Sequence, residues 1–99
     1  MKLDLEEEGG VTSVSLSNAA KLIAAYGKPT RVVLEDVPED GHTVTAFWLG
    51  ERSFKFTGFS WGYGGTGPHG LERFFEMAGI VCGMKTIMSW PEKGFKETL

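Results

Sequence analysis

Hydrophobic and polar positions alternate along the chain in a way that predicts several strands. Thr30 to Val37 is rich in β-branched residues, and His42 to Leu49 has the same character. Pro38 to Gly41, between them, has the proline, acidic and glycine residues typical of a tight turn. These runs therefore predict an antiparallel hairpin. Leucines alternate with charged residues over Met1 to Glu8, which predicts a further short strand.

Apolar residues recur at helical spacing in two places. The first helix is predicted to follow Ser17, a favourable N-cap residue, and to end at Gly27 and Pro29. The second is predicted to begin at Pro68, because proline lacks the N–H that has no helical partner at that position, and to end at Gly79. The residues expected on the two buried faces are Ala19, Leu22, Ile23 and Tyr26, and Leu71, Phe74, Phe75 and Ala78.

Gly58 divides four aromatic residues into two pairs. Phe54 and Phe56 precede it, Phe59 and Trp61 follow it, and the two pairs fall on opposite faces of an extended chain. One extra residue in the strand would return all four side chains to the same face. We therefore predict a β-bulge at Gly58.

A last strand is predicted over Met84 to Trp90, before the turn residues Pro91 to Gly94. The order of elements is then roughly β-α-β-β-β-α-β. We therefore predict one α+β domain over residues 1–99. It would have an antiparallel sheet of about four or five strands packed by two helices.

Composition and charge narrow the classes of function. A chain of 99 residues with 41% hydrophobic and 23% charged residues is typical of a single globular domain. Neither a membrane-spanning run nor a signal-peptide pattern is present, so we expect a cytoplasmic location and no membrane partner. A net charge of −3 argues against nucleic-acid binding. Residues 1–51 carry four bases and nine acids, whereas residues 52–99 carry six bases and four acids.

Trp61 to Gly70 (WGYGGTGPHG) places five glycines between a predicted strand and a predicted helix. Residues 62–67 match the G-x-G-x-x-G pattern of dinucleotide sites. Three observations argue against such a site. No acidic residue follows about 20 residues later, Pro68 removes an amide, and the preceding strands are predicted to be antiparallel. No Gly-Lys-Ser/Thr follows, which excludes a Walker-type loop.

Two interpretations of this stretch stay open. In the first, the glycines serve only positive φ and close packing of a helix against a strand. In the second, the free amides of His69, Gly70 and Leu71 bind an anion at the positive end of the helix. A planar part of the ligand would then stack on an aromatic ring. The candidate ligand-binding residues are Trp61, Tyr63, Gly64, Gly65, Thr66, Gly67, His69 and Gly70.

Catalytic and metal chemistry have little support in the sequence. No Ser/His/Asp or Cys/His set has a catalytic spacing, and His42, at a strand end, is expected to be exposed. Two histidines and one cysteine make a poor set of metal ligands. Cys82 is expected to be a buried hydrophobic residue. We predict no catalytic residue, no metal and no cofactor.

Gly58 to Pro68 (GFSWGYGGTGP) resembles the G-F-x-W-G-Y-G-G-[ST]-G-P motif of a family of small uncharacterised domains from bacterial, plasmid and phage genomes. Met84 to Phe95 is similar to that family's closing strand, proline turn and aromatic residue. After the proline, the family's Ala-Gln-Leu-Ala is replaced here by residues 69–72, so no role for His69 is carried over. The likeness covers residues 30–99 and implies a fold and a mobile-element origin, but no activity.

These observations favour a small non-enzymatic module that binds an anionic or nucleotide-like ligand at the glycine-rich turn. If the chain is phage-encoded, one concrete version would sequester a host signalling nucleotide. The alternative is a protein–protein interaction or homodimerisation module in which the turn is purely structural. That alternative expects a partly exposed aromatic patch, formed by Phe47, Trp48, Trp61 and Trp90.

Overall fold

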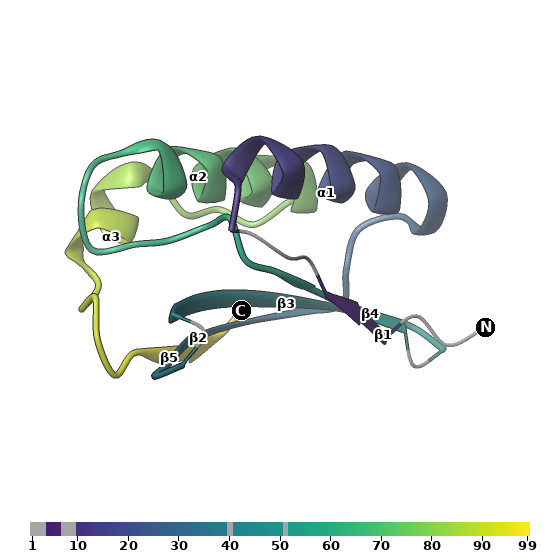
Figure 1. Ribbon diagram of the computed structural model, residues 1–99. Coiled ribbons are helices and arrows are strands. Elements are labelled where there is room, and N and C mark those ends of the chain that lie inside the picture. The colour runs from purple at the N-terminus through teal and green to yellow at the C-terminus, as the bar shows by residue number, and fades with distance from the viewer. Residues whose placement is uncertain (1–3, 7–9, 40, 51) are drawn as a thin grey trace.

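The chain folds into two layers, a five-stranded sheet with helices on one of its faces (Figure 1). The computed structural model describes residues 4–6, 10–39, 41–50 and 52–99. The strands are β1 (Asp4–Glu6), β2 (Arg31–Val37), β3 (Gly41–Trp48), β4 (Arg52–Phe56) and β5 (Lys96–Thr98). The helices are α1 (Thr12–Tyr26), α2 (Thr66–Ala78) and α3 (Met84–Ser89). The predicted α+β class is confirmed, and α3 is added to the predicted order.

The sheet has the strand order β1-β4-β3-β2-β5. The predicted hairpin is present, with Leu34 of β2 opposite Val44 of β3 in an antiparallel pair. β4 continues the antiparallel arrangement beside β3. β1 pairs with β4 in parallel, at the edge of the predicted antiparallel sheet. The remaining residues of the predicted first strand, and Asp40 of the predicted turn, lie outside the described residues.

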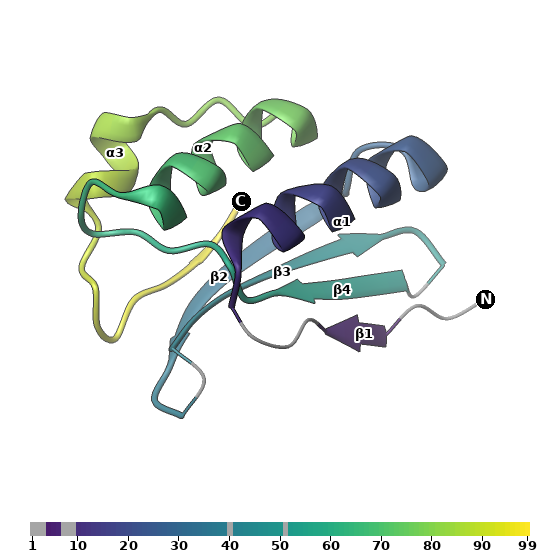
Figure 2. The same ribbon diagram turned by 45° about the horizontal axis from the view of Figure 1, so that its top comes forward.

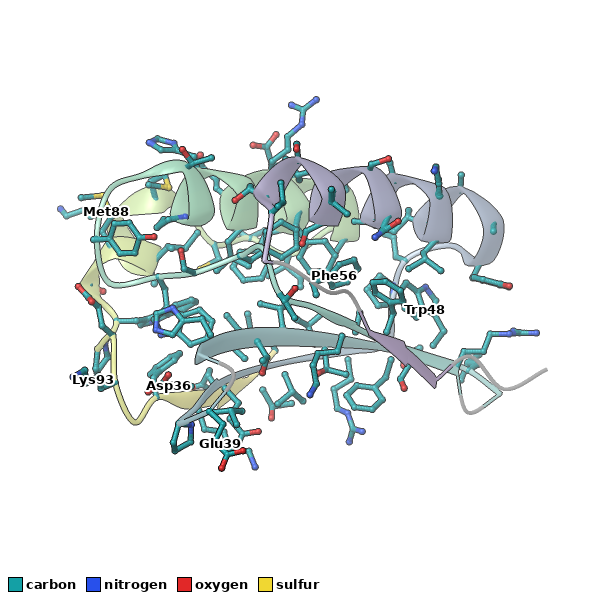
Figure 3. The ribbon with its side chains drawn as sticks, in the orientation of Figure 1. Asp36, Glu39, Trp48, Phe56, Met88 and Lys93 are labelled. Carbon is teal, nitrogen blue, oxygen red and sulfur yellow. The ribbon has the colours of Figure 1, made fainter. Side chains whose placement is uncertain are left out.

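The core lies between the sheet and the helices and is dominated by aromatic rings. Phe56 of β4 is fully buried, with its ring centroid 5.1 Å from that of Phe74 of α2 and 5.5 Å from that of Phe59. Figure 3 shows Phe56 and Trp48 in this space between the two layers. The predicted stripe of α2 is confirmed, because its four residues are all buried. In α1, Ala19 is buried, and the other three predicted residues pack against the core as partly buried side chains.

The chain leaves the sheet after Phe56, so the predicted bulge at Gly58 is wrong. All four aromatic side chains around Gly58 are nevertheless buried, because the extended chain turns from the sheet toward the helix layer. Gly58 lies against the first turn of α1. Its N–H donates to Ser15 Oγ at 2.9 Å, and its carbonyl accepts from Thr12 Oγ1 at 2.6 Å. A Cβ at Gly58 would lie only 2.6 Å from Ser15 Oγ.

This contact also explains why α1 begins earlier than predicted. The sequence suggested Ser17 as the N-cap, but the helix begins at Thr12, with Val11 at the N-cap position. Thr12 and Ser15 hydrogen-bond to Gly58, 46 and 43 residues away, rather than capping a local helix end. The N-cap therefore lies six residues before the predicted one, at a place that tertiary contacts determine. Its end is as predicted, with Gly27 at a φ of 82°.

The segment predicted as the last strand is the helix α3. Met84 and Ile87 are three residues apart, which fits one face of a helix but places them on opposite faces of a strand, and only Ile87 in this helix is buried. Glu72 of α2, expected to face water, accepts a hydrogen bond from the Met84 N–H at 3.0 Å. That bond satisfies an amide that has no acceptor within α3. The last strand is instead β5, which pairs with the edge of β2.

Replacing Gly58 by alanine should destabilise the fold. The new methyl group would overlap the Val11 backbone and Ser15 Oγ, so one of them has to move. Overpacking of this kind costs about 1–3 kcal/mol of unfolding free energy. Gly83→Ala is the matched control, because nothing lies within 4 Å of a Cβ at Gly83. Urea unfolding of both variants measures the difference. Equal stability of the two would contradict the proposed packing at Gly58.

Candidate functional site

The glycine-rich stretch is the link between β4 and α2, as predicted, but its glycines have different roles. Only Gly62 in this stretch has a positive φ, at 89°. Gly64 does not have one, so a left-handed backbone does not explain the glycine at this position. A Cβ at Gly67 would overlap Ser60 Oγ, and one at Gly70 would overlap the Thr12 methyl group. Close packing therefore accounts for Gly67 and Gly70.

The amides predicted to bind an anion are used inside α2. The helix begins at Thr66 rather than Pro68, and the His69 N–H donates to the Gly65 carbonyl at 3.0 Å. Gly70 lies further inside the helix, where its amide also has a helical acceptor. The donors without a helical acceptor are instead Thr66 and Gly67. Pro68, at the third helical position, has no N–H to offer.

A polar cavity of about 560 Å³ lies at this start of α2. It is lined by Gly10, Thr12, His42, Thr57, Gly58, Phe59, Ser60, Tyr63, Thr66 and Gly67. Most of its polar side chains are hydroxyls, and its described lining contains no carboxylate. Its volume falls within the range of small-molecule sites.

The N-terminal ends of both long helices meet at this cavity. Thr12 is the first residue of α1 and Thr66 is the first residue of α2, and both line it. Figures 1 and 2 show the two helices side by side over the sheet, with their N-terminal ends on the same side of the molecule. Neither helix has an acidic residue in its first turn. The positive ends of two helix dipoles therefore act on the same space.

Tyr63 and Ser60 bring two more hydroxyls to the cavity. Their oxygens are 2.9 Å apart and hydrogen-bonded, with either one as donor. The Tyr63 side chain is 45% exposed and stands over Gly65, where a Cβ would come within 2.8 Å of its ring. Each hydroxyl can still accept or donate a further bond. The Thr66 hydroxyl forms no hydrogen bond with any described residue.

His42 forms one wall of the cavity and is half-buried, so the expectation that it is exposed is wrong. Its ring stacks on Trp61, with the centroids 4.0 Å apart and the planes 2° from parallel. Its Nδ1 accepts from the Trp61 N–H at 3.2 Å, and its Nε2 bonds to the Glu92 carbonyl. Because a carbonyl only accepts, Nε2 carries the proton. Both ring nitrogens are therefore used in holding the fold together.

The structure brings some of the predicted site residues to the cavity and not others. Tyr63, Thr66 and Gly67 line it. Trp61 is fully buried, with its indole N–H donating to the Pro91 carbonyl at 3.0 Å, so it has no face for a ligand. Gly64 lines neither this cavity nor its neighbour and lies beside Met88, which Figure 3 labels. Gly65, His69 and Gly70 line a second groove on the other side of Thr12.

Sequence reasoning missed four polar residues of the cavity. These are Thr12, His42, Thr57 and Ser60. Ser60 lies inside the motif that resembles the small-domain family. That position was the only feature of the sequence that pointed to Ser60 as a site residue. Thr57 directly precedes that motif. Thr12 and His42 come from segments far apart in the chain and reach the cavity only through the packing of α1 and β3 against the glycine-rich link.

The aromatic patch expected for a protein–protein interface is not present. Trp61 is fully buried and Trp48 is 5% exposed, while Phe47 and Trp90 are half-buried. The Trp48 indole N–H donates to the Gly27 carbonyl at 2.8 Å, which fixes its ring under the end of α1. The homodimerisation alternative was based on this patch, so the full or partial burial of these four residues removes the reason for it.

Cys82 is half-buried rather than buried, and desolvation raises the pKa of its thiol. Among the described residues, no three His, Cys, Asp or Glu side chains are placed to hold a metal ion. In the same residues, no helix combines the length and apolar character needed to cross a bilayer.

No protein-family model matches the chain, and no curated protein or solved structure is significantly similar to it. The resemblance noted for residues 58–68 therefore stays an expectation, and a function has to be argued from the site itself.

Replacing His42 by phenylalanine should lower stability while keeping an aromatic ring against Trp61. The variant would leave the Trp61 N–H and the Glu92 carbonyl without their partner, which costs about 1–3 kcal/mol. His69→Phe is the control, because His69 is exposed and its side chain bonds to no described residue. Chemical denaturation compares the two variants. If both lose the same stability, His42 does not tie these segments together.

Proposed function

We propose that this protein is a non-enzymatic module that binds a small anionic ligand in the polar cavity between the starts of α1 and α2. The observation that carries the proposal is the meeting of two helix N-termini, through Thr12 and Thr66, at one cavity. Each terminus has amide donors without an acceptor in its own helix, and a partial positive charge. One such terminus is common in proteins, but two facing the same polar space favour an anion.

The lining supports the same conclusion. The Thr66 hydroxyl supplies one donor, and whichever of the Ser60 and Tyr63 hydroxyls accepts in their mutual bond supplies another. No described lining residue is a carboxylate that would repel an anion. The described lining contains no lysine or arginine either. The ligand would therefore be held by hydrogen bonds and helix dipoles rather than by ion pairs, which favours modest affinity.

The absence of catalysis is part of the proposal. The only histidine in the described lining is His42, and both of its ring nitrogens are bonded within the fold. A general base needs a free nitrogen facing a nucleophile. Ser60 pairs with the Tyr63 hydroxyl instead of with a base. Binding without chemistry is therefore the function that this arrangement supports best.

Inorganic phosphate and adenosine monophosphate test the proposal in an amide NMR titration. Both should shift the amide signals of Thr12, Ser13, Thr66 and Gly67, which lie at the two helix starts. Thr66→Val should weaken binding by about tenfold, because a hydrogen bond to a charged group is lost without a change in shape. Thr86→Val, at an exposed threonine of α3, should bind like the unmodified protein. If neither anion shifts these amides at tens of millimolar, the cavity does not bind anions.

A further inference from the structure

A second hollow adjoins the polar cavity. This groove, of about 530 Å³, lies between α1 and α2 and is lined by Thr12, Leu16, Gly65, Thr66, His69 and Gly70. Leu16, the threonine methyl groups and the glycine backbone give it apolar walls. Among the described residues that line it, only His69 has an ionisable side chain. Its character is therefore opposite to that of the polar cavity.

Thr12 and Thr66 line both hollows, so the two hollows are adjacent. The Thr12 side chain lies between the two hollows and has a different group on each side. Its hydroxyl donates to the Gly58 carbonyl on the cavity side, and its methyl group lies against Gly70 on the groove side. Gly65 and Gly70 carry no side chains, which keeps the groove open beside the start of α2.

We propose that the ligand is an anion bearing a flat or short apolar group, with the anion in the polar cavity and the apolar group in the groove. This inference rests on the proposed function and specifies the class of ligand. The apolar group would be attached directly to the anion, because only the two threonines separate the hollows. An aryl phosphate has this form.

The groove is less suited to recognising the polar edge of a nucleobase. The polar edge of a base needs several donors and acceptors in fixed positions. Among the described lining residues, His69 is the only one with a side-chain donor or acceptor besides the two threonine hydroxyls. A base could therefore contact the groove with its ring face, but it would gain no more than a phenyl ring does. This favours an aryl or alkyl anion over a specific nucleotide.

Dissociation constants for inorganic phosphate, phenyl phosphate and adenosine monophosphate test the inference by calorimetry or NMR. Phenyl phosphate should bind about tenfold tighter than inorganic phosphate, because roughly 60 Å² of apolar surface leaves water. Adenosine monophosphate should gain no more than phenyl phosphate. Leu16→Ser should remove most of the phenyl advantage and leave the phosphate constant unchanged. Leu49→Ser, at a 79% exposed leucine outside both hollows, should change neither.

The outcomes separate this inference from the proposed function. Equal dissociation constants for phosphate and phenyl phosphate would contradict the two-part site, but they would not contradict anion binding in the polar cavity. Failure of all three ligands to bind overturns both. Tighter binding of adenosine monophosphate, unaffected by Leu16→Ser, places the base outside the groove and also overturns the inference. If Leu16→Ser does not fold, the unmodified protein still decides, because phenyl phosphate should shift the Leu16 methyl signals and inorganic phosphate should not.

Discussion

The contact between Gly58 and the first turn of α1 is the constraint on which the rest of the structure depends. Both backbone polar groups of Gly58 are satisfied there, by Ser15 Oγ and Thr12 Oγ1. A buried backbone group without a partner is costly, so these two bonds fix where the chain can leave the sheet. Since a Cβ would overlap Val11, only glycine permits so close an approach. The start of α1 is thereby held against the link that leads into α2.

A second close approach fixes the spacing of the two helices. Gly70 of α2 lies under the Thr12 methyl group, where a Cβ would overlap it. Thr12 therefore takes part in both contacts, with its hydroxyl at Gly58 and its methyl group at Gly70. The two helices start side by side because glycine backbone replaces side chains at these points. The hollows on either side of Thr12 follow from the same packing.

The sequence was informative where hydrophobic periodicity was strong. The hairpin of β2 and β3 and the buried stripe of α2 could be predicted, because their patterns repeat over seven or more residues. The six residues of α3 were too few to distinguish a helix from a strand by their pattern. The contact that favours the helix comes from α2, where Glu72 accepts a hydrogen bond from the Met84 N–H. β5 has three exposed residues, so burial leaves no pattern in its sequence. Its position depends on backbone pairing with β2.

The candidate site was predictable only in its location on the chain. The glycine-rich link was found, but the hydroxyls that face it from α1 come from sequence positions whose local pattern says nothing about a cavity. His42 shows the same limit, because its two bonds reach Trp61 and Glu92, which are 19 and 50 residues away. Partners this far apart in the sequence can be identified only from the folded structure.

Glycine content is therefore poor evidence for a ligand in this chain. Gly62 has a left-handed backbone, and Gly67 and Gly70 lie where a Cβ would overlap a neighbour, so chain geometry already requires all three. Gly64 has neither constraint and lies outside both hollows. What favours ligand binding is a feature that the motif does not encode. Two helices begin at the same polar space, and their unused amides need acceptors that the described protein groups do not supply. Water can meet that need at little cost, and an anion meets it with the added attraction of two helix dipoles.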